Sequence, residues 1–183
     1  MNTRKQTQPT FTAIRTLIIV FQILGASCAI FAQQTSPQNS NEVLDEAKTK
    51  TDLYRADADA RVEISEALKK AVAEKKRVLL IFGGNWCYDC HVLDQALHEG
   101  AAGRIVKQSY LLVHVDIGEA NKNLDLVEKY KSTLAKGVPT VVLLDRTGRV
   151  IYSSTEGEFE AARKMMKKDL VAFLNHWKEV GVR

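Results

Sequence analysis

The sequence predicts an α/β domain in which helices cover both faces of a central mixed sheet. Helical and strand-like segments alternate along most of the chain, as such layers require. The run Val78-Leu79-Leu80-Ile81-Phe82 is apolar throughout, which is typical of a strand that is covered on both faces. Further on, two apolar runs flank Asp145-Arg146-Thr147-Gly148, a turn signal between antiparallel strands. A parallel portion followed by a hairpin fits this order.

Four segments carry apolar residues at the spacing of a helix. In the first, Ile64, Leu68 and Ala71 share one side. Gly100 and Gly103 are expected to stop the second helix. The four helices are expected over 59–75, from 88 to about 100, over 124–131 and over 159–177.

Four strands are expected between these helices. Continuous apolar runs predict the first two, and the turn signal separates the last two. The strands are expected over 77–82, 110–115, 140–144 and 149–153. The order of the strands within the sheet does not follow from periodicity.

The composition is that of a globular protein with a real core. The chain has 183 residues, of which 45% are hydrophobic and 26% charged. The formal net charge is +4, and Arg4, Lys5 and Arg15 supply most of it in an amino-terminal segment that has no acidic residue. The remainder has no long run of one sign, so a basic face for nucleic acid is not indicated.

Residues 1–32 have the pattern of a secretory signal peptide. Basic residues precede the apolar stretch 17–24, small residues follow it, and Ala32 is a suitable cleavage point. A retained amino-terminal anchor is the alternative, although the stretch is shorter than the roughly 20 apolar residues of a spanning helix. Lipid modification of Cys28 is a third option, and only the anchor or the lipid would attach the protein to a membrane. The expected location is the periplasm or cell envelope.

The remainder divides into a linker and one domain. Residues 33–51 are rich in Gln, Ser, Asn, Thr and Lys and are expected to form a polar linker. Residues 52–183 then form a single domain of common size. If cleavage follows Ala32, Cys87 and Cys90 are the only cysteines left, and a pair without a surplus thiol suits an oxidising compartment.

The most informative segment is Gly83-Gly84-Asn85-Trp86-Cys87-Tyr88-Asp89-Cys90-His91, directly behind the first strand. Two thiols separated by two residues at a strand-to-helix junction are suited to forming and breaking a disulfide. Cys87 would lie at the amino end of the helix, where free backbone N–H groups and the helix dipole lower a thiol pKa. Cys90, one turn later, would resolve the mixed disulfide.

Two neighbours of the cysteines are expected to tune their redox chemistry. The carboxylate of Asp89 should oppose the Cys87 thiolate and raise the pKa of that thiol. A protonated His91, near the same helix start, would offset this effect.

Three other functions use the same residues. Cys87-Tyr88-Asp89-Cys90-His91 matches the attachment signature of c-type haem, with His91 as axial ligand. The two cysteines and His91 could bind a metal ion together with His98 or His114. A closed structural zinc site needs four ligands, however, and the sequence has no second Cys-x-x-Cys. A non-catalytic interaction module is the third possibility. Neither a metal nor an organic cofactor is required by the disulfide hypothesis.

The sequence resembles the thioredoxin superfamily, and more narrowly its secreted members with a Trp-Cys-x-x-Cys motif. Three features match in order over about 63–177: the segment Trp86-Cys87-Tyr88-Asp89-Cys90, a central strand that ends in Asp116, and Gly137-Val138-Pro139-Thr140. The resemblance implies a three-layer sandwich. It also implies a cis bond between Val138 and Pro139, against the cysteine pair.

The resemblance further implies how a substrate would dock. The backbone of Val138 would pair with an extended substrate strand, Pro139 would shield the thiols, and Trp86 would shape the docking surface. Cys87 and Cys90 would then act as a thiol–disulfide oxidoreductase on protein thiols and disulfides, together with an unidentified redox partner. The protein is expected to act as a monomer.

The sequence also departs from the better-known thioredoxin pattern. Ile81 stands where a buried acid is common, and Leu112 replaces a lysine of the neighbouring strand. Because the acid relays the proton of the second thiol in the family, another group such as Glu128 would have to act in its place. The segment 117–136 is also longer than in a minimal thioredoxin and is expected to add a loop near the site.

Overall fold

The middle layer of the molecule is a mixed sheet. The computed structural model describes residues 41–179, and within them the sheet has four strands in the order β2-β1-β3-β4. These are β1 (Arg77–Gly83), β2 (Tyr110–Asp116), β3 (Thr140–Leu144) and β4 (Val150–Ser153). β1 is parallel to β2 and antiparallel to β3, which is antiparallel to β4. The predicted parallel portion and hairpin are confirmed.

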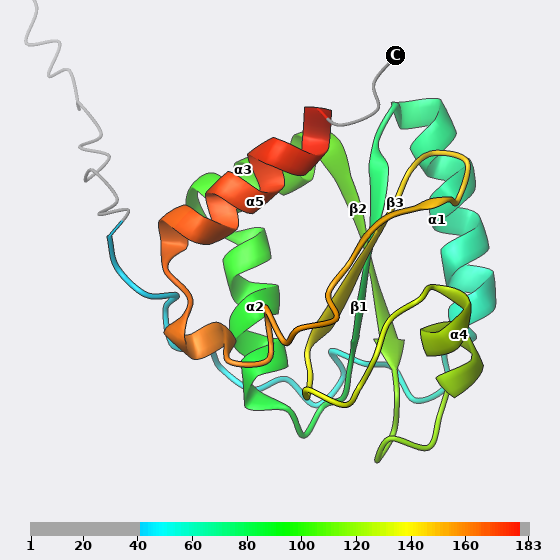
Figure 1. Ribbon diagram of the computed structural model, residues 1–183, viewed down its shortest axis with the longest axis horizontal. Helices are drawn as coiled ribbons and strands as arrows, with labels where there is room; N and C mark the ends of the chain where they lie inside the picture. The colour runs from blue at the N-terminus through cyan, green and yellow to red at the C-terminus, as the bar shows by residue number, and fades with distance from the viewer. Residues whose placement is uncertain (1–40, 180–183) are drawn as a thin grey trace, which may run out of the picture. The chain divides into compact units, whose positions relative to one another are not determined.

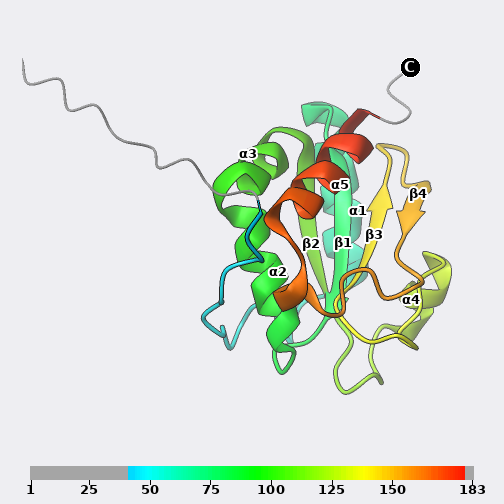
Figure 2. The same cartoon turned by 60° about the vertical axis from the view of Figure 1, so that its left-hand side comes forward.

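Helices cover both faces of this sheet, so the predicted three-layer sandwich is confirmed. α2, α3 and α5 lie on one side, and α1 and α4 lie on the other (Figures 1 and 2). The bounds are α1 (Ala60–Glu74), α2 (Tyr88–His98), α3 (Gly100–Ser109), α4 (Leu124–Lys129), the 3-10 helix η1 (Ala162–Lys164) and α5 (Lys167–Glu179). None of the helices in the described range 41–179 is long and apolar enough to cross a membrane.

The strand β1 is buried along its whole length. Leu79 and Ile81 pack into the core with α2, α3 and α5. Val78, Leu80 and Phe82 pack into the opposite core with α1 and α4. Because successive side chains of a strand point to opposite faces, only a continuously apolar strand can serve both cores.

The structure adds a helix that the sequence analysis missed. α2 ends before Gly100, as expected, but α3 begins there and continues to the start of β2. Gly100 has a φ of +55°, a left-handed conformation that lets the chain turn between the two helices. Both glycines that were expected to stop a helix lie inside α3, whose Ala102 and Val106 are buried.

The last helix begins at Lys167 rather than at residue 159. The backbone just before it pairs with the amino-terminal segment instead: Leu44 N–H donates to Met165 O over 2.9 Å, and Lys167 N–H donates to Glu42 O over 2.8 Å. A helix through residue 166 would use these groups internally. The prediction was wrong here because the competing partner lies far away in the sequence.

The described part of the expected polar linker, from residue 41 to 51, packs against the domain. The side chain of Leu44 is only 5% exposed and belongs to the core on the α2, α3 and α5 side. The packed region therefore begins before the expected boundary at residue 52. The expected signal peptide or anchor over 1–32, with Cys28, and the first part of the linker lie outside the described residues.

The same segment is joined to α2 by an ion pair. Lys50 Nζ lies 2.7 Å from Asp94 Oδ2, and His98 Nδ1 and His114 Nε2 lie 3.3 Å and 3.1 Å from Asp94 Oδ1. Burial disfavours the charge on Asp94, but His114, His98 and Lys50 outweigh it and hold the pKa of Asp94 far below its usual value. The carboxylate in turn raises the pKa of His98.

The packing of the amino-terminal segment can be tested with adjacent residues. Leu44→Ala should lower the free energy of unfolding by about 2–5 kcal/mol, because it leaves a cavity in the core. Val43→Ala is the matched control, since Val43 is 48% exposed and should change little. Urea unfolding followed by circular dichroism measures both. Equal, small effects would show that Leu44 does not belong to the core.

The Asp94 cluster predicts a pH dependence of stability. Because the folded-state pKa of Asp94 is depressed, its contribution is present above the ordinary value of 3.8 and is lost as the pH falls below it. Asp94→Asn should therefore cost about 1–3 kcal/mol near neutral pH. Denaturant unfolding between about pH 6 and pH 2.5 should show a steeper acid loss in the wild type than in the variant. Parallel curves would contradict this assignment.

Candidate active site

Cys87 and Cys90 form a disulfide where β1 passes into α2, and their Cα atoms are 5.3 Å apart. Cys87 is the N-cap residue of α2, and the N–H of Cys90 donates a hydrogen bond to Cys87 Sγ over 3.1 Å. The expected position of the first cysteine is thereby confirmed. N–H groups directed at a sulfur favour its negative charge, so this geometry stabilises a Cys87 thiolate once the disulfide opens.

The two sulfurs differ in their access to solvent. Cys87 is 6% exposed, whereas Cys90 is completely buried. A partner molecule can therefore reach Cys87 but not Cys90. This asymmetry suits a pair in which one cysteine attacks and the other resolves.

The sheet register places a proline beside this pair. Phe82 pairs with Thr140 across β1 and β3, so the residue before β3 lies next to the end of β1. The peptide bond between Val138 and Pro139 is cis, as expected. Val138 O lies 3.5 Å from Cys87 Sγ, a contact rather than a hydrogen bond because a disulfide sulfur carries no hydrogen. Pro139 itself is buried.

Hydroxyl groups fix the chain directly behind this proline. Thr140 Oγ1 lies 3.0 Å from Ser132 Oγ and 2.8 Å from Ser154 Oγ. Ser154 Oγ also accepts a hydrogen bond from Val141 N–H over 2.7 Å. These bonds hold the start of β3, and with it Val138 and Pro139, at one position relative to Cys87.

Trp86 is a surface residue rather than a core aromatic, with 55% of its area exposed. Its Nε1–H donates to Gly118 O over 2.9 Å, and its ring lies over Gly84. Gly118 belongs to the segment that the sequence suggested as an added loop, and that segment does reach the site. The indole therefore forms an apolar surface directly beside Cys87.

Asp89 forms an ion pair that the sequence analysis missed. Its carboxylate accepts hydrogen bonds from Arg163 N–H over 2.9 Å and from Arg163 Nε over 3.1 Å, and Arg163 Nη2 also contacts it. Burial opposes ionisation of Asp89, but Arg163 outweighs it and holds the pKa of Asp89 below its usual value. The negative charge near Cys87 is thus compensated. Because the partners are 74 positions apart in the sequence, no local pattern signals the pair.

His91 is buried and uses both ring nitrogens. Nδ1 accepts a hydrogen bond from Lys50 N–H over 3.3 Å, which leaves Nε2 to carry the proton and donate it to Asn85 O over 2.9 Å. A His91 that offsets Asp89 would have to give up the hydrogen bond from Lys50 N–H, and its redox-tuning role stays a prediction.

The histidines of the haem and metal hypotheses are engaged elsewhere. His91 has no free nitrogen for an axial bond to haem iron. The side chains of His98 and His114 contact the carboxylate of Asp94 instead of the cysteines. The arrangement of the side chains therefore favours the disulfide hypothesis over both alternatives.

Two positions where the family commonly has charged groups are apolar here. Ile81 is fully buried in the core, and Leu112 packs against that core. Leu112 pairs with Leu79, however, and the residue beside Ile81 on β2 is His114. Glu128, which the sequence analysis considered as a substitute acid, is exposed on α4.

Tyr54 is a further site residue that the sequence analysis did not identify. It clusters with Cys87 and Cys90, and only 1% of its surface is exposed. It lies before α1 in a segment without periodicity, so the sequence contains no signal for it.

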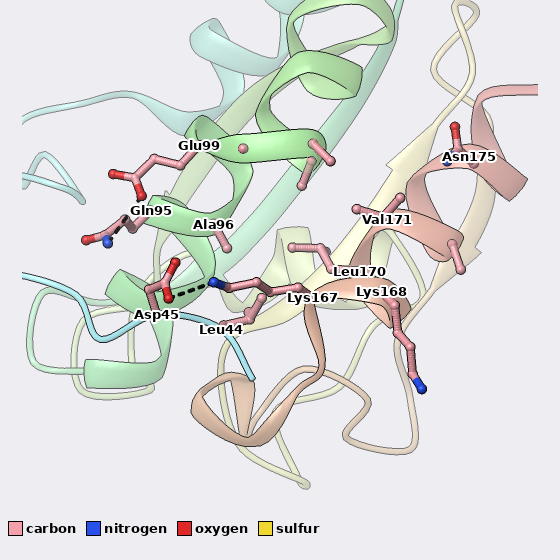
Figure 3. A pocket seen from close by; sticks show the side chains of 14 residues that line it. Leu44, Asp45, Gln95, Ala96, Glu99, Lys167, Lys168, Leu170, Val171 and Asn175 are labelled. Atoms are coloured by element: carbon pink, nitrogen blue, oxygen red, sulfur yellow. Dashed lines mark hydrogen bonds and ion pairs between the residues drawn. The ribbon is translucent and has the colours of Figure 1, made fainter. Parts of the chain in front are cut away.

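A hollow of about 430 Å³ lies away from the cysteines, between the amino-terminal segment, α2, α3 and α5. Figure 3 shows Leu44 and Leu170 within it and the ion pair of Lys167 with Asp45 across it, at 2.8 Å. None of the predicted site residues lines this hollow. It is therefore separate from the redox pair.

Comparison with known proteins agrees with this architecture. A family model described as thioredoxin-like matches residues 59–146. A solved structure described as a disulphide isomerase from Xylella fastidiosa Temecula1 is 32% identical, with a TM-score of 0.65, over 69% of this chain and 97% of that one.

Two other solved structures are more distant. A thioredoxin from Thermus thermophilus is 17% identical, with a TM-score of 0.49, over 64% of this chain and 85% of that one. The oxidised C-terminal domain of DsbD from Neisseria meningitidis is 16% identical, with a TM-score of 0.46, over 67% of this chain and 96% of that one. No curated protein matches the sequence. The family model and the Xylella structure, together with the cysteine pair and the cis proline, show that this chain belongs to the thioredoxin-like family.

Proposed function

We propose that this protein is a thiol–disulfide oxidoreductase that exchanges disulfides with protein substrates in the cell envelope. The observation that carries the proposal is the disulfide between Cys87 and Cys90 at the amino end of α2, with one sulfur accessible and the other enclosed. The similarity to a Xylella fastidiosa protein described as a disulphide isomerase supports the same chemistry. The signal-like pattern of residues 1–32 supports the envelope as the location.

The exchange proceeds in two substitutions at sulfur. In reduction, the Cys87 thiolate attacks a substrate disulfide, forms a mixed disulfide and releases one substrate thiolate. Cys90 then attacks Cys87 Sγ, which forms the internal disulfide and releases the second substrate thiolate, and that thiolate takes up the proton that Cys90 gives up. The two electrons pass from the cysteine pair to the substrate, whose first thiolate takes a proton from solvent. Oxidation of a substrate dithiol is the reverse.

Substrate docking uses the surface around Cys87. An extended substrate strand lies along the backbone at Val138, with the substrate sulfur placed toward Cys87. The exposed indole of Trp86 contacts the substrate on the other side. The reduction potential of the pair, relative to that of its redox partner, decides the direction of exchange.

The roles of the two cysteines can be separated by substitution. Cys87→Ser should reduce the catalysed reduction of insulin by dithiothreitol to the uncatalysed rate, because no accessible nucleophile remains. Cys90→Ser should keep the attack but trap a mixed disulfide, visible on non-reducing gels and reversed by excess thiol. Insulin reduction at the wild-type rate by both variants would disprove the assignment.

The Asp89–Arg163 pair predicts a shift in the reactivity of Cys87. Arg163→Gln should uncover the negative charge of Asp89 and raise the pKa of the Cys87 thiol by about half a unit to one unit. The double variant Asp89→Asn/Arg163→Gln is the matched control and should return toward the wild-type value. The pH dependence of iodoacetamide alkylation of reduced Cys87 measures this pKa. A single variant with an unchanged or lower pKa would contradict the role of Arg163.

A further inference from the structure

The hydroxyl group of Tyr54 is buried without a hydrogen bond. Its Oη has no partner among residues 41–179, although the side chain is almost completely enclosed. A buried hydroxyl that makes no hydrogen bond is costly, and native structures contain few of them. Tyr54 therefore requires an explanation beyond packing.

The hydroxyl borders the same space as the buried sulfur of the redox pair. A Cβ atom on Gly83 would lie 2.5 Å from Tyr54 Oη and 2.6 Å from Cys90 Sγ, so both atoms border the same small space over the end of β1. Tyr54 also packs with Cys87 and Cys90 in one cluster. Glycine at position 83 allows the hydroxyl and the sulfur to approach each other.

The active-site loop itself holds Tyr54 in this place. The amide of Asn85 makes two hydrogen bonds with the Tyr54 backbone: Tyr54 N–H donates to Oδ1 over 2.9 Å, and Nδ2 donates to Tyr54 O over 2.8 Å. The ring of Tyr54 meets that of His114 edge to face, with centroids 5.3 Å apart. The phenol is thus fixed relative to the cysteines from two sides.

We propose that Tyr54 is a positioning residue of the redox pair, whose hydroxyl donates a hydrogen bond to Cys90 Sγ when the disulfide is open. This inference rests on the proposed function, because it requires a pair that opens and closes. Ile81 offers no polar group, its neighbour His114 on β2 contacts Asp94, and Glu128 is exposed. The tyrosine hydroxyl provides the polar contact that these positions lack.

The hydrogen bond acts in the resolving substitution. The Cys90 thiolate attacks Cys87 Sγ, the bond between the two cysteines forms, the bond from Cys87 to the substrate breaks, and the leaving substrate thiolate takes up the proton that Cys90 has given up. The cysteine pair is oxidised and the substrate is reduced by two electrons. Throughout, the phenol keeps its proton, because burial raises the pKa of Tyr54 well above its usual value. It stabilises the Cys90 thiolate as a donor and is not a base.

The hydrogen bond should also favour the reduced form of the protein. A thiol or thiolate accepts it, whereas the disulfide sulfur in the structure does not. Loss of the hydroxyl removes this stabilisation from the reduced form and relieves the unsatisfied group of the oxidised form.

Tyr54→Phe tests this inference because it keeps the ring and removes the hydroxyl. In glutathione redox buffers, the equilibrium constant for oxidation of the pair should increase about three- to tenfold over wild type, measured by alkylation and mass spectrometry of the full chain. The mixed disulfide of the variant with glutathione should resolve more slowly, by about tenfold, in stopped-flow measurements.

Tyr110→Phe is the matched control. Tyr110 is also buried, but its hydroxyl donates to Leu174 O over 2.6 Å, away from the cysteines. This variant should lose stability equally in both redox states and keep the wild-type redox equilibrium. If Tyr54→Phe matches the wild type in both equilibrium and resolution rate, the inference is wrong while the proposed function stands. If the wild-type pair itself does not exchange with glutathione, the proposed function is overturned together with the inference.

Discussion

The burial of β1 between two apolar cores is the constraint on which the rest of the structure depends. Leu79 and Ile81 enter one core, and Val78, Leu80 and Phe82 enter the other, so this strand cannot shift or turn over. The chain leaves it at Gly83 and reaches the cysteines within four residues. β3 pairs with β1 directly and brings the cis proline to the same end. The redox pair and the backbone at Val138 therefore share one rigid support.

The carboxylates on α2 near the pair are each compensated by cationic or histidine partners. Arg163 compensates Asp89, and Lys50, His98 and His114 surround Asp94. Both ring nitrogens of His91 are engaged with the backbone. What remains to act on the sulfurs is the N–H of Cys90 at Cys87 and, on our proposal, the hydroxyl of Tyr54 at Cys90. On that proposal, two hydrogen-bond donors act on the sulfurs directly.

Local patterns in the sequence predicted most of the fold and the centre of the site. The four strands, the position of Cys87 at the start of a helix and the cis bond before Pro139 all follow from short motifs or apolar runs, with the cis bond carried by the family resemblance. The features that the sequence did not predict share a different cause. Leu44 in the core, the start of α5 at Lys167 and the partners Arg163 and Tyr54 depend on contacts between segments that are distant in the chain. Periodicity reports only on neighbours within a few turns, so it cannot show such contacts.

The central claim is that Cys87 and Cys90 form a reversible redox couple. Mass spectrometry of the peptide that spans both residues, after mild reduction and again after exposure to oxidised glutathione, tests it most directly. The account predicts a gain of two hydrogens on reduction and their loss on reoxidation, confined to this peptide. A peptide whose mass does not change under either condition, in a protein that remains folded, would contradict it.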